Sequence, residues 1–389
     1  MKILGIVLAG AAVGGAAPPP PVATYWMDVA TQSGMGAGMT PGARPDASQM
    51  MAMMSGGGAS ERHTLDLRLA SRTRPTGEAQ ADHFIPAALQ MGASLPLVAP
   101  AVVHDEPAPG LPPGFQRPKG RMLIYWGCGD HVSAGQPTII DFAKVAAGQV
   151  PPGMAAMANL AHVVQGPSSA PGFGRWPNQR DSRAVPAAGS LIGAHKVEGN
   201  YSPPIAFSLG SGEDFMPALG LREGGAMPSG AARLLWRPAA QATGYALAMF
   251  GSDEAGDVIM WSSAKSAQMP AMDYLAPAEV RRLVAAGAVL PPAASECLLP
   301  AEVAAASPMG MVTMIGYGPE VDFAEAPKAP KWTAKVRFKT SASVMRGMAA
   351  MMGDQSDDSA AQPQPPKPQP RKKRGFGLGD VLGGMPIPH

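Results

Sequence analysis

Alternating apolar and polar residues are the clearest pattern along this chain, and they predict β-strands with one buried face. Residues 64–69 (TLDLRL) place leucines at every second position, and residues 121–126 (RMLIYW) form an almost continuous apolar run. Two further strands are predicted between residues 191 and 209. Helix is scarce: the candidates are residues 138–147 and residues 277–286, of which the second has a proline near its first turn and Gly287 at its end. The pattern predicts a mainly β fold.

Three short strands separated by turn residues are predicted between residues 231 and 263. Their sequences are LLW at 234–236, GYALAMF at 244–250 and DVIMWSS at 257–263, which indicates an antiparallel meander. Trp236 and the tetrapeptide ATGY at 242–245 resemble fibronectin type III-like modules of bacterial exported proteins, over residues 231–263 only. The resemblance implies that Trp236, Tyr245 and Trp261 pack a sandwich core and are not catalytic. The predicted helix at 277–286 departs from the family, which would continue with strands.

The chain divides into two predicted β-rich units between disordered ends. The units are residues 61–225 and residues 226–345, and the second is sandwich-like and antiparallel with short helices. Residues 17–60 form a leader rich in Pro, Gly and Met, and residues 346–389 form a Pro-rich basic tail. We predict that both ends are disordered because neither offers a periodic apolar face. Residues 24–29 (TYWMDV) are the exception, a candidate strand that would pair with the folded body.

The last predicted strand, residues 331–341, has two different faces. Alternate positions are apolar on one face and basic on the other: Trp332, Ala334, Val336 and Phe338 against Lys331, Lys335, Arg337 and Lys339. Two interpretations are open. The strand is either an outer strand whose lysines prevent edge pairing, or a strip that binds phosphate or a polymer.

The first seventeen residues are typical of an export signal. Lys2 precedes an apolar run at 3–13 and a small-residue exit at 14–17, so we predict a signal peptide at residues 1–16 with cleavage after Ala16. The rival interpretation of the run is a buried strand. The run is shorter than a membrane-crossing helix requires, so we expect a periplasmic or otherwise exported protein that does not span the membrane.

Composition narrows the range of partners. The chain has 389 residues with a formal net charge of +2, and only 15% of the residues are charged. This balance gives no global field that would attract nucleic acid, so we predict no nucleic-acid partner. The basic run at 371–374 sits on the Pro-rich tail and would suit a contact with a phosphate-bearing surface or a partner, or it is a solvated tail without a partner.

Cys128 and His131 form the one compact cluster of reactive side chains in the sequence. A thiolate and an imidazole this close could supply a nucleophile and base, or part of a metal site, but no second pair at ligand spacing exists. Cys128 and Cys297 are the only cysteines. They form either one long-range disulfide, if the protein is exported, or two buried thiols.

From these patterns we expect a non-catalytic structural or binding protein of the bacterial cell envelope. Its partner would be an envelope protein or polymer, contacted through loops and the basic tail. We assign no catalytic, cofactor-binding or metal-binding residue and no cofactor. The alternative is a Cys/His-dependent hydrolase or metal-binding protein centred on Cys128 and His131.

Overall fold

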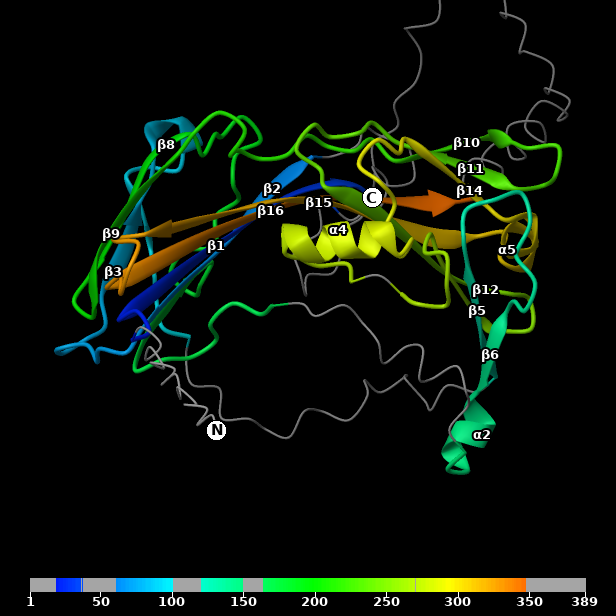
Figure 1. The fold of residues 1–389 in the computed structure, drawn as a ribbon, viewed down its shortest axis with the longest axis horizontal. Coiled ribbons are helices and arrows are strands. Elements are labelled where there is room, and N and C mark those ends of the chain that lie inside the picture. Colours follow the sequence, from blue (N-terminus) through cyan, green and yellow to red (C-terminus); the bar gives the residue numbers. More distant parts are fainter. Residues whose placement is uncertain are drawn as a thin grey trace, which may run out of the picture. The chain divides into compact units, whose positions relative to one another are not determined.

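Strands dominate the protein (Figure 1). The computed structural model describes residues 19–35, 37, 61–100, 120–149, 164–269 and 271–347. These residues form sixteen strands and three short α-helices. The predicted mainly β fold class is confirmed. The predicted signal peptide, much of the predicted leader and nearly all of the predicted tail lie outside the described residues.

The largest sheet has nine strands. In order across the sheet they are β6 (Thr138–Asp141), β5 (Arg121–Trp126), β13 (Val258–Ser262), β12 (Gly244–Ser252), β15 (Gly310–Ala324), β16 (Trp332–Arg346), β1 (Ala23–Gly34), β2 (Arg62–Ser71) and β7 (Gly172–Trp176). Neighbours are antiparallel except for β1 with β16 and β5 with β13, which are parallel. Both predicted β-rich units contribute strands to this sheet, a point that the sequence left open.

Two smaller sheets pack against one face of the large sheet. One contains β4 (Ser94–Pro96), β3 (Ala81–Phe84), β8 (Gly193–Gly199) and β9 (Ser202–Leu209), and the other contains β10 (Arg222–Ala226), β11 (Ala232–Leu235) and β14 (Glu296–Leu299). A single hydrophobic core joins all three sheets. The ring of Tyr25 on β1 lies 6.1 Å from Phe207 on β9, and Trp236 beside β11 lies 5.8 Å from Tyr245 on β12. The arrangement is a layered sandwich.

A chain of buried polar groups links β1 to the four-stranded sheet. Tyr25 Oη lies 2.9 Å from His83 Nδ1, His83 Nε2 lies 3.0 Å from His195 Nδ1, and His195 Nε2 lies 2.7 Å from the carbonyl oxygen of Leu191. A carbonyl oxygen only accepts, so His195 Nε2 carries the proton and its Nδ1 accepts from His83. His83 Nδ1 then accepts from the Tyr25 hydroxyl, and both imidazoles are neutral.

Strands β1 and β16 lie side by side near the middle of the large sheet. The strand predicted at residues 24–29 is confirmed, and disorder was the wrong prediction only for Ala23 and residues 30–34, which extend this strand. The outer-strand interpretation of residues 331–341 is also wrong, because β16 pairs with β15 on one side and β1 on the other. Strands β1 and β16 come from opposite ends of the described chain, and the local sequence of neither strand indicates that the two would pair.

Helix α4 (Pro277–Ala285) covers part of the opposite face of the large sheet (Figure 1). Its buried Val280 and Leu283 pack in a second cluster with Ile315 and Tyr317 of β15. The helix confirms the prediction at 277–286, and Gly287 follows it with a φ of 73°. No helix within the described ranges is long and apolar enough to cross a membrane.

Two local predictions need correction. Residues 138–141 form strand β6, and helix α2 (Phe142–Ala146) begins only after Asp141, whose carboxylate accepts from two backbone amides of the first turn. Strands β12 and β13 pair as the meander predicts, but β11 belongs to the smaller sheet in the other layer. Trp236, Tyr245 and Trp261 are all buried in the core, as expected. The remaining helix is α5 (Ala301–Ala306).

Candidate functional site

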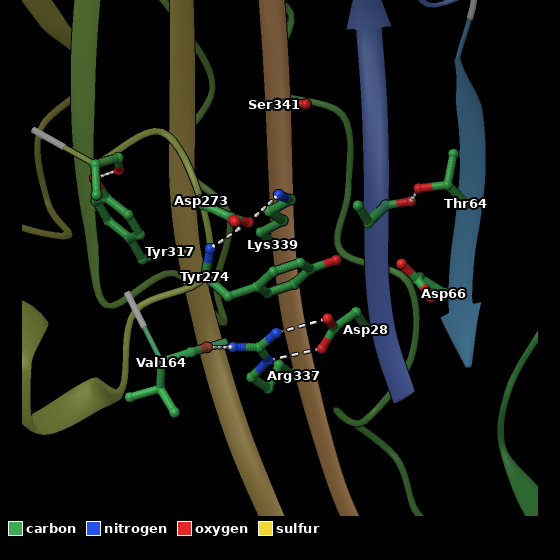
Figure 2. Close-up of polar contacts among 12 residues, drawn as sticks. Asp28, Thr64, Asp66, Val164, Asp273, Tyr274, Tyr317, Arg337, Lys339 and Ser341 are labelled. Atoms are coloured by element: carbon green, nitrogen blue, oxygen red, sulfur yellow. Dashed lines mark hydrogen bonds and ion pairs between the residues drawn. The ribbon is translucent and has the colours of Figure 1, made fainter. Parts of the chain in front are cut away.

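Charged side chains gather on the face of the large sheet that carries α4, beyond the part that the helix covers (Figure 2). The period of two along each strand sends one set of residues of β1, β2 and β16 into the core and the alternate set, which is mostly polar but includes Trp26, to this face. The strand register places Asp28 between Arg337 of β16 and Asp66 of β2. The neighbouring strands β16, β1 and β2 therefore present Arg337, Asp28 and Asp66 side by side.

These strands and the nearby loops surround a cavity of about 430 Å³. Such a volume lies within the range of about 300–1,000 Å³ that holds small ligands. The loops around residues 165, 177–185 and 273–274 form its other walls. Its lining includes three acidic and six basic side chains: Asp28, Asp66, Asp273, Arg62, Arg68, Arg175, Arg183, Arg337 and Lys339.

The innermost contact is the ion pair between Asp28 and Arg337, which are 5% and 6% exposed. Arg337 Nε and Nη2 each donate to one carboxylate oxygen at 2.6 Å, and Nη1 donates to the carbonyl oxygen of Val164 at 2.8 Å. The guanidinium lies 4.5 Å from the ring of Trp26 and 4.6 Å from the ring of Tyr274. All three nitrogens of Arg337 are thus engaged, so this residue holds the site together.

A second ion pair fixes the loop at residues 273–274 onto β16. Lys339 Nζ donates to Asp273 Oδ1 at 2.8 Å and lies 4.1 Å from the ring centre of Tyr274. Burial alone would raise the pKa of Asp273, but the hydrogen bond and charge of Lys339 outweigh it and the pKa lies below its usual value. Burial, and then the charge of Asp28, raise the pKa of Tyr274 well above its usual value, so its hydroxyl stays protonated.

The third acid, Asp66, lies within ion-pair distance of two arginine side chains. Arg68 donates to it from Nε at 3.2 Å and from Nη2 at 2.7 Å, whereas Arg175 Nη2 lies 4.0 Å away. The hydrogen bond that Arg68 donates to Asp66 is the main cause of the raised pKa of Arg68. Arg175 of β7 is 43% exposed at its side chain, and its Nε has no hydrogen-bond partner among the described residues. Arg175 therefore forms a longer ion pair than Arg68 and Arg337 do.

The cluster predicted at Cys128 and His131 is arranged differently. Cys128 forms a disulfide with Cys297, which lies 169 positions later, so the long-range bridge is the alternative that the structure contains. His131 Nδ1 lies 3.0 Å from Glu302 Oε1 on the surface. Within the described segments, no three His, Cys, Asp or Glu side chains form a group that could hold a metal ion. Cys128 consequently presents no thiol here.

The sequence pattern predicted only the basic residues of the charged site that lie on β16. The basic face of residues 331–341 was recognised, but Asp28, Asp66 and Asp273 were not. The available signal was the polar residue at every second position of residues 64–69, and Asp28 within residues 24–29, which indicates a second face of each strand but not what lies opposite that face.

Comparison of the chain with protein-family models, with curated proteins and with solved structures found no match in any of the three. The function of the site is therefore inferred from the geometry of its residues. The fibronectin type III-like resemblance stays a prediction.

Proposed function

We propose that this chain is an exported, non-catalytic binding protein of the cell envelope whose ligand is an anion held in the cavity over β1, β2 and β16. The observation that carries the proposal is the incomplete pairing of Arg175 in the cavity lining. Asp28, Asp66 and Asp273 each form a short ion pair with another base, whereas Arg175 lies 4.0 Å from Asp66 and its Nε has no hydrogen-bond partner among the described residues. A carboxylate or phosphate on the ligand would pair with Arg175.

Strand register adds a second argument. Arg68 on β2 and Arg175 on β7 lie directly opposite each other, and like charges at such positions repel. Asp66 forms a close ion pair with Arg68, at 2.7 Å, but lies 4.0 Å from Arg175, so it offsets the charge of Arg175 less well. An anion beside Arg175 would relieve the remaining repulsion, so the site favours anions over cations.

Export and the non-catalytic role have their own support. A disulfide such as Cys128–Cys297 persists in oxidising compartments, in agreement with the signal-like first seventeen residues. The disulfide also leaves Cys128 without a thiolate, which weakens the case for a Cys/His-dependent hydrolase. In the cavity, the acids are held in ion pairs, and the lowered pKa of Asp273 makes it a weak general base.

Calorimetric titration at low ionic strength tests anion binding. The probes are inorganic phosphate, succinate and D-glucuronate, and we expect at least one to bind the wild-type protein. Arg175→Gln should weaken that binding at least tenfold. The matched control is Arg180→Gln, because Arg180 is 61% exposed, lies near Arg175 in sequence and is not part of the cavity lining. The proposal fails if no probe binds, or if Arg175→Gln and Arg180→Gln bind alike.

Mass analysis of the protein from fractionated cells tests export. The expected species is found outside the cytosol and begins at Ala17. Recovery of the uncleaved chain from the cytosolic fraction would contradict this part of the proposal.

A further inference from the structure

Tyr274 is only 8% exposed, and its hydroxyl group forms no hydrogen bond among the described residues, although it is not one of the fully buried polar atoms. Figure 2 shows its ring lying across β16 with the hydroxyl pointing toward β1 and β2. Arg337 and Lys339 contact the ring at 4.6 Å and 4.1 Å, so the ring is held in this orientation. Tyr274 lines the cavity, so its free hydroxyl can donate a hydrogen bond to a ligand or to water there.

Asp66 lies on the side to which the Tyr274 hydroxyl points (Figure 2). Its side chain is 30% exposed and lines the same cavity. A carboxylate has about four acceptor sites, of which Arg68 uses two. The cavity therefore presents a donor from Tyr274 and unused acceptors from Asp66 toward a common space.

A ligand group in this space must both accept a hydrogen bond and donate one. A hydroxyl group does both. An ammonium group cannot accept from the phenol, and an anionic oxygen cannot donate to Asp66 and is repelled by it. The anionic group of the ligand belongs instead at Arg175, whose Nη2 lies 4.0 Å from Asp66. The two recognition points are adjacent, so the hydroxyl and the anion belong to one small molecule or one unit of a polymer.

We infer that the ligand is a sugar acid, a ring with hydroxyl groups and one carboxylate, as in the uronic acid units of acidic polysaccharides. One hydroxyl lies between Tyr274 and Asp66, and the carboxylate lies on Arg175. This inference rests on the proposed function, because it requires anion binding in the same cavity. It adds that Tyr274 and Asp66 select for hydroxyl groups.

Three probes separate the parts of the inference in calorimetric titrations of the full mature chain. D-glucuronate carries both features, cyclohexanecarboxylate keeps the ring and carboxylate without hydroxyls, and methyl glucoside keeps hydroxyls without the charge. We expect glucuronate to bind at least tenfold more tightly than either of the others. Tyr274→Phe removes only the hydroxyl oxygen, and it should weaken glucuronate binding about tenfold while leaving cyclohexanecarboxylate unchanged.

Tyr201→Phe is the matched control, because the Tyr201 hydroxyl also has no hydrogen-bond partner among the described residues but is not part of the cavity lining. It should leave the order of the three probes unchanged. If Tyr274→Phe does not fold, the order of the probes on the wild-type protein still decides the matter.

The outcomes separate the two levels of the proposal. Equal binding of glucuronate and cyclohexanecarboxylate would overturn the sugar-acid inference and leave anion binding intact. Equal binding of glucuronate and methyl glucoside would overturn anion binding. Tight binding of phosphate and succinate without glucuronate binding would support an anion site and exclude the sugar acid.

Discussion

Arg337→Met should destabilise the protein by about 3–5 kcal/mol, because it leaves the Asp28 carboxylate buried without its partner. The magnitude follows from the burial of the pair, at 5% and 6% exposure, and from the bidentate geometry with both bonds at 2.6 Å. Arg337 also loses its bond to Val164 and its contacts with the rings of Trp26 and Tyr274. These contacts favour the upper half of the range.

A double-mutant cycle separates the ion pair from the packing. Asp28→Leu alone leaves the guanidinium unpaired and should cost a similar amount. In the double variant neither charge remains, so its loss should be smaller than the sum of the two single losses by about 2 kcal/mol or more. Urea denaturation followed by tryptophan fluorescence, with the disulfide kept intact, measures each free energy of unfolding.

Arg233→Met is the control for this cycle. Arg233 pairs with Glu296 on the surface, where both side chains are more than 40% exposed, so its loss should cost about 1 kcal/mol or less. Two results would refute the reasoning: a loss below about 1 kcal/mol for Arg337→Met, or strictly additive losses in the cycle.

Three further predictions test other parts of the fold. Reduction of the Cys128–Cys297 disulfide should lower the free energy of unfolding by about 2–5 kcal/mol, measured by urea denaturation with and without a reductant; the C128S/C297S variant should not respond to the reductant. Burial lowers the pKa of His83 and His195 below 6.5, and the charge of one disfavours protonation of the other. The unfolded chain then binds protons that the native chain excludes, so stability should fall as pH drops below about 6.5, by up to about 1.4 kcal/mol per histidine per pH unit; a urea midpoint constant from pH 7 to pH 5 would contradict this. Gly174→Ala would place a Cβ 2.6 Å from the Tyr201 hydroxyl oxygen, and chemical denaturation should detect a loss of about 1–3 kcal/mol.

Local sequence patterns were sufficient to predict secondary structure where a strand or helix buries one apolar face against the core. The alternation at residues 64–69 corresponds to β2, in which Leu65, Leu67 and Leu69 are buried, and the proline and glycine around residues 277–287 delimit α4. The helix prediction was wrong for residues 138–141, because these residues form a strand that depends on pairing with β5, which is a tertiary contact. Asp141 caps the helix that follows these residues, so the helical part of the predicted segment begins only at Phe142.

The charged cavity could not be predicted, because long-range register creates it. Asp28, Asp66, Asp273 and Arg337 lie on four separate segments, and no short window of sequence contains more than one of them. Pairing of β1 with both β2 and β16 sets three of these residues in one row. The alternation revealed that β16 has a charged face, whereas only the sheet order shows that acids, and not solvent, lie opposite it.

Strand β1 contributes side chains to both faces of the large sheet. It supplies Tyr25 to the buried histidine chain on one face and Asp28 to the ion pair with Arg337 on the other. Both contacts depend on its parallel pairing with β16, so the last strand has neither its central position nor its acidic partner until β1 is in place. Cleavage of the proposed signal after Ala16 would leave β1 beginning at Ala23, close to the new amino terminus. The anion site would then assemble only in chains that retain this terminal strand, which makes the mature amino terminus a part of the site.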